Sequence, residues 1–387
     1  MAKVLIIAAD GTAIDHLDYS YMRMLEEGLD VTIAAPEKRD LKTTVHWGEP
    51  GEYLYTVERP GYTVPSHIAF DDVDPTQYDG LLIPGGRAPE YIRTNQRCLD
   101  IIRHFLDSGK PVSATCHGPL LLLAAGVTGK KMTCTDDTRA DVEVYGNTYL
   151  PARGAWENEP DHIRDGNIVT ARGWFHWHDW VREFLNMLEE RGLHKRVRKS
   201  ARVLILAGDH SSSGQAGYGY ERMCEEGFDV ALAAPRKGVM KTIIDQREEG
   251  WDMKPIAGLY DFETIGFELW ATHVIDEIDP AQYDGLLLPG GRGPEYLRNI
   301  PANRNAVQHF IDSDKPIGAI CQGVRYLLAN GVKGRQLTGP DYIRTEIEQG
   351  NRFVAATSEP VIDGNILTVS GRPHYHVWVR EFLKMLP

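Results

Sequence analysis

The chain contains one domain-sized sequence twice, and this duplication limits the folds that it can adopt. The stretch Val4–Asp10 returns as Val203–Asp209, roughly 200 residues later. Solenoid repeats have periods of about 20–50 residues, so this spacing indicates two copies of a complete domain. We place the first domain at residues 1–192 and the second at residues 201–387, joined by a basic linker at residues 193–200.

Within each copy, short apolar runs alternate with segments of helical periodicity. The apolar runs of the first copy, which are typical of buried strands, are residues 4–9, 31–35, 80–83, 111–115 and 167–170. The segments with apolar residues at i, i+3 and i+4, which predict helices, are residues 19–27, 98–106 and 179–188. Strands buried on both faces and separated by helices predict a mostly parallel sheet that is covered on both sides.

Composition and charge exclude several classes of protein. A content of 42% hydrophobic and 25% charged residues is typical of folded globular domains. The formal net charge of −13 argues against a nucleic-acid or anionic-membrane partner, and no apolar stretch reaches the roughly 18 residues that span a bilayer. The 5 cysteines are odd in number and lack CxxC spacing, and a strand begins directly after Lys3. We therefore expect a cytoplasmic protein without a signal peptide.

Cys116 lies in a stretch that has the pattern of a nucleophile elbow. An apolar strand ends at the cysteine, Gly118 follows two positions later, and the apolar run at residues 120–127 predicts a helix. Such a tight turn needs a small residue after the nucleophile, because the backbone passes close to itself. The helix dipole would then favour the thiolate, so the pattern predicts a reactive thiol rather than a structural cysteine.

The predicted topology brings three turns to one edge of the sheet. Ligands of parallel sheets bind outside the carboxyl ends of the strands. The turn after Ala9, the Gly85–Gly86 turn and the Cys116 elbow all follow predicted strands. The long polar and aromatic segments 38–77 and 237–282 differ between the copies, and long connections are usually lids or extra hairpins. We therefore expect these segments to shape two unlike pockets.

Several motifs of the first copy occur together: Tyr-Asp-Gly-Leu at 78–81, Pro-Gly-Gly-Arg-Ala-Pro-Glu-Tyr at 84–91, Gly-Lys-Pro-Val at 109–112 and Cys-His-Gly-Pro at 116–119. Their combination resembles the ThiJ/PfpI superfamily, and within it the PfpI branch. The tandem layout is similar to plant members that act as cofactor-free glyoxalases (glyoxalase III). The resemblance implies an α/β architecture of two tandem flavodoxin-like (class I glutamine amidotransferase-like) three-layer sandwiches with mostly parallel sheets.

The same resemblance implies the chemistry of the site. Cys116 would be the reactive cysteine, and the backbone N–H groups of Gly86 and His117 would form the oxyanion hole. No cofactor is implied, and the partner would be a small-molecule substrate. Members of the branch oligomerise, so we expect domain 1 to pack against domain 2, or the chain to form a homo-oligomer.

The sequence departs from the superfamily at the position of its acid/base glutamate. Alignment of each copy to the superfamily pattern without gaps, over residues 4–36 and 203–235, places His16 there in the first copy and Gln215 in the second. Asp15 is close enough in sequence to supply a carboxylate if the local turn shifts. An imidazole beside a thiol is also a workable general base, because its unperturbed pKa lies near neutrality. The predicted catalytic residues are Cys116, His117 and His16.

The second copy lacks an obvious base. Cys321 is followed by Gln322, where the first copy has His117, and a glutamine cannot transfer a proton near pH 7. We therefore expect the main active site in domain 1. The candidate second site consists of Cys321, Gln322, Gln215, Gly291, His374 and His376.

Paired histidines precede the last helix of each copy, His176 and His178 in the first and His374 and His376 in the second. If the segment is extended, alternate side chains point the same way, and each pair presents two imidazoles to the pocket. We favour a pocket-lining role, with Zn²⁺ held together with the predicted nucleophile and base as a weaker alternative. The other residues predicted to line the pocket are Asp15, Glu90 and Trp174.

These features favour a cofactor-independent cysteine enzyme that acts on a small carbonyl or carboxamide compound. Attack by Cys116 would give a tetrahedral adduct, followed by glyoxalase III-type hydration or by C–N bond hydrolysis. The enzyme would thus be a lyase or an amidase-like hydrolase, and a peptidase fits less well because long segments beside the elbow would admit a peptide poorly. The alternative is an oxidation-sensing or chaperone-like stress protein that uses the same thiol without turnover.

Overall fold

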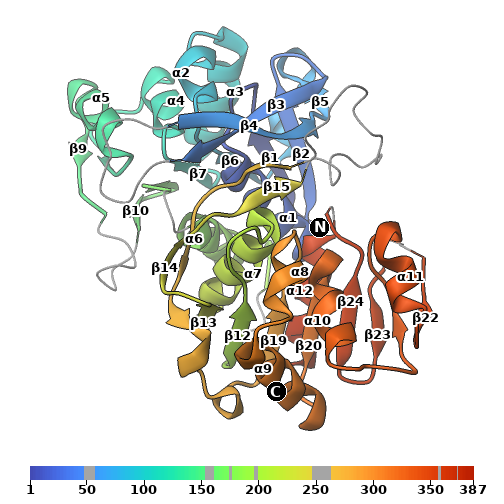
Figure 1. The fold of residues 1–387 in the computed structure, drawn as a ribbon. Helices are drawn as coiled ribbons and strands as arrows, with labels where there is room; N and C mark the ends of the chain where they lie inside the picture. Colours follow the sequence, from blue (N-terminus) through green and yellow to red (C-terminus); the bar gives the residue numbers. More distant parts are fainter. Residues whose placement is uncertain are drawn as a thin grey trace. The chain divides into compact units, whose positions relative to one another are not determined.

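The computed structural model describes residues 1–47, 57–152, 161–173, 177–195, 199–245, 263–355, 359–372 and 374–387. The chain divides into two compact units, with the boundary between residues 197 and 198, inside the segment 193–200. Each unit contains a seven-stranded sheet with helices on its two faces (Figure 1). The predicted architecture of two tandem α/β sandwiches is confirmed.

The sheet of the first unit is parallel except at one edge. Its strands, in spatial order, are β10 (His162–Asp165), β11 (Ile168–Ala171), β7 (Val112–Thr115), β6 (Gly80–Ile83), β1 (Lys3–Ile7), β2 (Asp30–Ala35) and β5 (Ile68–Ala69). Only β10 runs antiparallel to its neighbour within this sheet. Because the other strands are parallel, the carboxyl ends of β1, β6 and β7 lie at the same edge.

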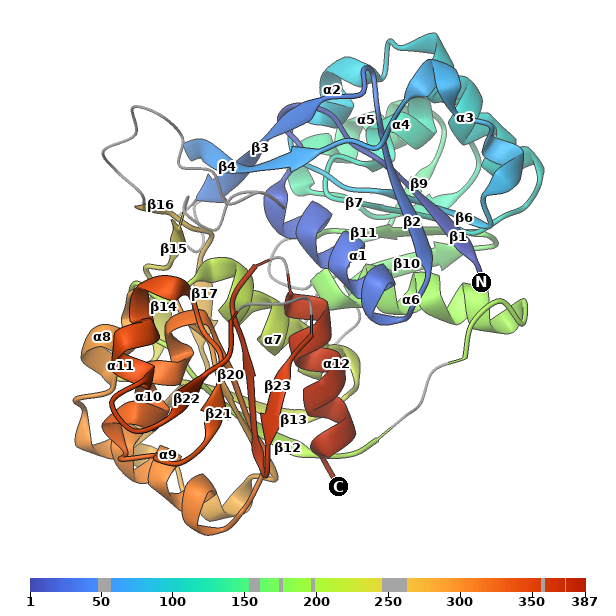
Figure 2. The ribbon, with the colours of Figure 1, turned by 90° about the vertical axis from the view of Figure 1, so that its right-hand side faces the viewer.

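Helices cover both faces of this sheet. Figure 2 shows α1 (Ile14–Glu26) and α6 (Trp177–Glu190) on one face. The other face carries α2 (Ala88–Ile92), α3 (Gln96–Asp107) and α4 (Pro119–Ala124), with α5 (Arg139–Val144) next to α4. The unit is therefore a three-layer sandwich with both sides of the sheet buried.

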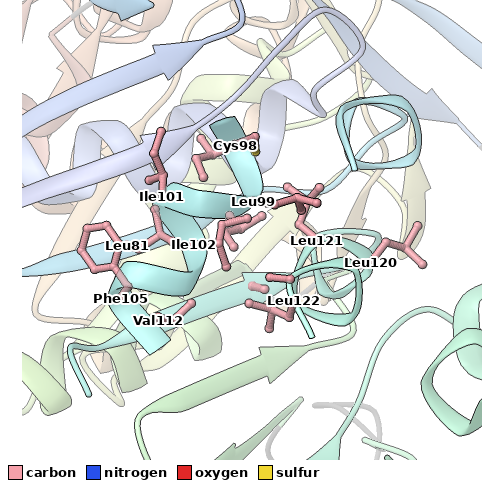
Figure 3. Packing of buried hydrophobic residues seen from close by; sticks show 14 of the residues in the cluster. Leu81, Cys98, Leu99, Ile101, Ile102, Phe105, Val112, Leu120, Leu121 and Leu122 are labelled. Atoms are coloured by element: carbon pink, nitrogen blue, oxygen red, sulfur yellow. The ribbon is translucent and has the colours of Figure 1, made fainter. Parts of the chain in front are cut away.

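Alternation along the strands sends side chains to the two helical layers. Leu81 and Val112 pack with Phe105 of α3 in one buried cluster (Figure 3). The next residue, Ser113, faces the other layer, where its hydroxyl donates to the backbone carbonyl of Trp180 in α6 (3.2 Å). Burying one large apolar side chain contributes about 1.5–3 kcal/mol, so both layers help to hold the strands and the turns at their ends.

The second unit repeats this architecture. The strands of its sheet, in spatial order, are β18 (His273–Val274), β13 (Asp229–Ala234), β12 (Arg202–Leu206), β19 (Gly285–Leu288), β20 (Ile317–Ile320), β24 (Ile366–Val369) and β23 (Val361–Asp363). Its helices are α7 (Ser213–Glu225), α8 (Gly293–Leu297), α9 (Pro301–Asp312), α10 (Val324–Ala329), α11 (Arg344–Ile347) and α12 (Tyr375–Met385). Again one edge pair, β23 with β24, is antiparallel.

Small two-stranded sheets accompany the large ones. They pair β3 (Asp40–Trp47) with β4 (Val57–Pro65), β8 (Lys131–Met132) with β9 (Thr148–Tyr149), β14 (Gly238–Met240) with β17 (Leu269–Ala271), β15 (Ile243–Asp245) with β16 (Glu263–Ile265), and β21 (Gln336–Leu337) with β22 (Arg352–Phe353). Three of the pairs, β3–β4, β14–β17 and β15–β16, lie in the long segments for which extra hairpins were expected.

One helix boundary differs clearly from the prediction. Helix α1 begins at Ile14, a full turn before the predicted start at residue 19. Its first turns contain His16 and Asp18, and both of these polar side chains are buried. Apolar periodicity cannot reveal a helix whose buried face is partly polar, so the pattern showed only the apolar end of α1.

Within the described ranges, no helix is both long enough and apolar enough to cross a membrane.

Candidate active site

Three turns interlock at the carboxyl ends of β1, β6 and β7, as predicted for a parallel sheet. The N–H of Ala13 donates to the carbonyl of Gly85 (3.1 Å), and the N–H of Arg87 donates to the carbonyl of Gly11 (2.8 Å). Gly86 has a φ of +88°, and an added Cβ would lie 2.4 Å from the backbone nitrogen of Ala13. Only glycine fits there, so the paired glycines fix the geometry of the turn.

Cys116 occupies the strained turn expected of a nucleophile elbow. Its φ of +59° is uncommon for a residue other than glycine, and its N–H donates to the carbonyl of Ala171 (2.9 Å). A Cβ on Gly118 would lie 2.5 Å from the carbonyl oxygen of Ile83, and a Cβ on Gly85 would lie 2.4 Å from the Cβ of Cys116. The predicted need for a small residue after the cysteine is confirmed, and Gly85 meets the same need on the neighbouring turn.

The pKa of the Cys116 thiol differs from the prediction. Although part of the residue is exposed, burial of the thiol raises its pKa to about 12, and the negative charges of Asp137 and Asp15 add to the rise. Burial and the two carboxylates thus work against the thiolate that the sequence pattern predicted. Helix α4 has 6 residues, so the row of peptide dipoles that could favour the thiolate is short.

Two backbone donors nevertheless act on this thiol. The N–H groups of Gly86 and His117 favour a negative charge on the sulfur of Cys116 and oppose the rise in its pKa. These are the two groups predicted to form the oxyanion hole. Donors held in this way can stabilise negative charge on an oxygen that develops beside the sulfur, at no cost of reorganisation.

His16 is buried beside the elbow in the first turn of α1. Its Nε2 lies 2.7 Å from the carbonyl oxygen of Gly173, which can only accept, so Nε2 carries the proton. Its Nδ1 has no hydrogen-bond partner in the described part of the chain. A Cβ on Gly173 would lie 3.1 Å from Nε2 and 3.2 Å from the backbone nitrogen of Cys116, so the imidazole and the elbow flank the same glycine. Nδ1 is therefore the ring nitrogen with a free lone pair, and in the resting chain it makes no hydrogen bond to the sulfur of Cys116.

The side chain of His117 points to carboxylates instead of the thiol. Its Nδ1 lies 2.8 Å from Oε1 of Glu90, and its Nε2 lies 3.0 Å from Oδ2 of Asp137. The bond to His117 lowers the pKa of Asp137 well below its usual range, although burial opposes it. With both ring nitrogens engaged, His117 offers the thiol its backbone N–H and no free ring nitrogen, so its predicted role as a base has no geometric support.

A charged chain continues from this histidine to the hairpin β3–β4. Arg87 forms an ion pair with Glu90 (2.7 Å) and a second with Glu58 of β4. Burial raises the pKa of Glu90, but the hydrogen bond and charge of Arg87, with those of His117, outweigh burial and lower it. The salt bridge expected between Arg87 and Glu90 is present, and it ties the Gly-Gly turn to the hairpin.

The hairpin also contributes an imidazole. His46 of β3 lies 3.9 Å from Glu58, and Asp15 and His16 are among the charges that act on it. Burial lowers the pKa of His46, so its ring is mainly neutral at pH 7. Asp15 itself lies 3.8 Å from the Nε2 of His16, which places the predicted carboxylate at the site.

The second unit has the same elbow with different partners. Cys321 has a φ of +56° but is only 2% exposed, and its sulfur lies 3.8 Å from the hydroxyl of Tyr342. Gln215 accepts a hydrogen bond from the N–H of Gly290 (2.7 Å), at the position where the first unit has a histidine. Gly291 has a φ of +80° and repeats the Gly86 turn. Cys321, Gln322 and Gln215 thus meet at the Gly290–Gly291 turn.

An arginine replaces the histidine of the charged chain in the second unit. Gln322 stands at the His117 position and accepts from Arg325 (2.6 Å). The same guanidinium donates to Glu295 (2.8 Å) and Glu346 (2.6 Å). The first unit has Leu120 at the Arg325 position. A titratable imidazole in the first unit thus corresponds to a permanently charged guanidinium in the second.

The predicted extended histidine segment is a helix start. His178 lies in the first turn of α6 and His376 in the first turn of α12, while His374 precedes α12 and contacts the hydroxyl of Ser370 (3.3 Å). The second pair therefore does not lie on an extended segment, because His376 is helical and His374 directly precedes the helix. His176 and Trp174 lie outside the described residues. Among the residues that the structure describes, no group of three or more His, Cys, Asp or Glu could hold a metal ion.

Sequence patterns missed several residues of the site because they lie outside the motifs. Asp137 belongs to the short 3₁₀ helix 136–138, His46 and Glu58 to the hairpin, and Arg325 to the start of α10. Their spacing carries no motif, and topology alone brings them to the elbow. The acidic pair at residues 136–137 was the one sequence feature that could have pointed to one of these missed residues, Asp137.

The motifs and the elbow geometry agree with one protein family. The family model described as DJ-1/PfpI matches residues 2–187 and again residues 201–385. The chain belongs to the DJ-1/PfpI family. The predicted resemblance and the tandem layout of this DJ-1/PfpI chain are both confirmed.

Curated relatives match either nearly the whole of this DJ-1/PfpI chain or about half of it. Protein DJ-1 homolog D of Arabidopsis thaliana is 29% identical over 402 residues, which cover 99% of this chain and 97% of that protein. A deglycase of Thermococcus kodakarensis is 37% identical over 187 residues, or 48% of this chain and 99% of its own. The deglycase PfpI of Pyrococcus furiosus is 35% identical over 188 residues, with the same coverage. At the family level, the chain is a DJ-1-like cysteine enzyme or stress protein.

Proposed function

We propose that the first unit is a cofactor-independent enzyme that attacks small carbonyl compounds through Cys116. The observation that carries this proposal is the convergence of the Gly86 and His117 N–H groups on the sulfur of a partly exposed cysteine with positive φ. Such a site suits a reaction in which sulfur bonds to a carbonyl carbon and the oxygen becomes negative. The names of the archaeal deglycases support a carbonyl-derived substrate class.

The proposed first step couples bond formation to proton transfer. The sulfur of Cys116 attacks the aldehyde carbon of a 2-oxoaldehyde while the thiol proton passes to Nδ1 of His16. The carbonyl electron pair moves to the oxygen, which the N–H groups of Gly86 and His117 hold. The proton then returns to that oxygen and gives a hemithioacetal. A raised thiol pKa is compatible with this order, because the base acts during the attack and not before it.

The later steps need only a proton shuttle and water. The proton on the hemithioacetal carbon is removed, its electron pair forms the enediol, and reprotonation at the neighbouring carbon gives a thioester. One carbon is oxidised and the other is reduced by the same pair of electrons. Water then breaks the C–S bond and releases a 2-hydroxy acid. With a carboxamide or an amine adduct, the tetrahedral adduct would instead break its C–N bond, and the amine would leave with a proton.

The second unit is proposed to bind without turnover. Its cysteine is buried, and Gln215 stands where His16 stands in the first unit. An amide can orient a ligand, but it cannot move a proton near neutral pH.

A cytoplasmic location remains a prediction from the odd number of cysteines.

Turnover of phenylglyoxal tests the proposal. The purified chain should convert it to mandelate over many cycles, measured by chromatography, and Cys116→Ala should produce none above background. An amine adduct of glyoxal, assayed in parallel, would show whether the C–N branch is the faster one. If neither substrate turns over and mild peroxide converts Cys116 to its sulfinic acid, the stress-sensor function takes the place of the proposed one.

A further inference from the structure

Asp161 directly precedes β10 and is a buried acidic residue of the first unit. The residue is 1% exposed, and neither of its carboxyl oxygens has a well-formed hydrogen bond in the described part of the chain. A buried acceptor without a partner costs about 1–3 kcal/mol, and a charged one more. A fold that contains such a group needs a reason for it beyond stability.

The main chain of Asp161 is held tightly. Its N–H donates to Oδ2 of Asp179 in α6 (2.9 Å), and its carbonyl accepts from the N–H of Arg172 (3.2 Å). The backbone N–H of Gly173 is among the groups that act on its carboxyl. Gly173 is the residue whose carbonyl accepts from His16 (2.7 Å). A single glycine therefore connects the buried carboxyl with the imidazole.

We propose that Asp161 is a positioning residue for His16. Asp161 pairs through its backbone with Arg172, the neighbour of Gly173, and its carboxyl acts on the Gly173 N–H without a formed hydrogen bond. This attraction would keep the glycine carbonyl on Nε2 of the imidazole and leave Nδ1 unprotonated. The inference rests on the proposed function in one respect, namely that His16 serves Cys116 as a base. It adds a residue that touches neither the substrate nor the sulfur.

The comparison between the two units supports this role. Glu359 and Val377 occupy the Asp161 and Asp179 positions of the second unit. That unit also has Gln215 in place of His16. The buried aspartate pair and the imidazole are thus present together in the first unit and absent together from the second. A purely architectural role for the aspartates would give no reason for this association.

The protonation state of Asp161 gives the inference a measurable signature. Burial raises its pKa to about 8, the charge of Asp179 adds to the rise, and Arg172, Gly173 and His178 oppose it. The other charged groups around Asp179 are His162 and Arg182. The carboxyl therefore loses its proton between about pH 7 and 9, and the charged form attracts the Gly173 N–H more strongly.

Alkylation of Cys116 by iodoacetamide, followed by peptide mass spectrometry, tests this coupling without requiring turnover. Asp161→Asn should slow alkylation about three- to tenfold at pH 9 and remove an inflection near pH 8. In the His16→Ala background, the same change should alter the rate less than about twofold, since the imidazole through which it acts is gone.

The outcomes separate the two proposals. Equal slowing in both backgrounds, or no slowing in either, would overturn the positioning role of Asp161. Thermal unfolding of each variant monitors folding, and Asp161→Glu, the residue of the second unit, replaces Asp161→Asn if the latter does not fold. If the wild-type chain shows no turnover but the coupling is present, the proposed enzyme function fails and the link from Asp161 to His16 stands.

Discussion

Replacement of Cys116 by serine should lower turnover of a 2-oxoaldehyde by about a thousandfold or more, because a serine hydroxyl is a far weaker nucleophile in the same position. The same replacement at Cys321 should retain at least half of the activity. Both cysteines have positive φ in equivalent elbows, so the two variants disturb the fold alike. Initial rates with phenylglyoxal measure the difference.

The matched design makes this comparison decisive. Cys116 is partly exposed, with an imidazole nearby, whereas Cys321 is 2% exposed and has a glutamine in that place. A large loss on changing Cys321, with Cys116→Ser still active, would move the working site to the second unit. Equal partial losses would mean that both units turn over substrate.

A methyl group on Gly85 should also lower turnover strongly, although about tenfold less than loss of the nucleophile. The added Cβ would lie 2.4 Å from the Cβ of Cys116 and 2.9 Å from the carbonyl oxygen of Thr115, so the elbow must shift. Displacing a reacting group by about 1 Å can lower a rate about a hundredfold. Gly85→Ala should therefore reduce turnover by about two orders of magnitude and destabilise the unit by about 1–3 kcal/mol.

Two control variants separate displacement of the sulfur from general damage. Gly290→Ala introduces the same collision at Cys321, at 2.8 Å, and should destabilise the second unit while sparing turnover. Gly109 has a φ of +65° and free space around its Cβ position, so Gly109→Ala should only cost about 1–2 kcal/mol of backbone strain. Thermal unfolding and initial rates are measured on all three. Full activity of a folded Gly85→Ala would contradict the elbow geometry.

The architecture of the chain could be predicted almost completely from its sequence. The repeat and the alternation of apolar runs with helical patterns predicted two sandwiches, because buried parallel strands such as 80–83 leave a continuous apolar signal. Helices and strands with buried polar side chains were harder to predict from the sequence. Helix α1 contains His16 on a buried face, and no hydrophobic period marks such a residue.

The candidate site could be predicted only where a local motif carries its geometry. Gly118 and Cys116 were found because a tight turn requires particular residues at fixed spacing, whereas Gly86 was found through the family resemblance. The state of the thiol could not be read in this way, because its pKa depends on burial and on Asp137, which is distant in sequence. Neither could the orientation of His117, whose carboxylate partners come from two other segments.

The most direct test of the central claim, that the first unit carries a thiol activated only during attack, is the alkylation rate of each cysteine between pH 7 and pH 10. Iodoacetamide should modify Cys116 faster than Cys321 at every pH, because only Cys116 is partly exposed. With a thiol pKa of about 12, the alkylation rate of Cys116 should rise about tenfold per pH unit, apart from the inflection near pH 8 expected from Asp161. This rate should reach no plateau below pH 10. A plateau already at pH 7, or faster modification of Cys321, would contradict it.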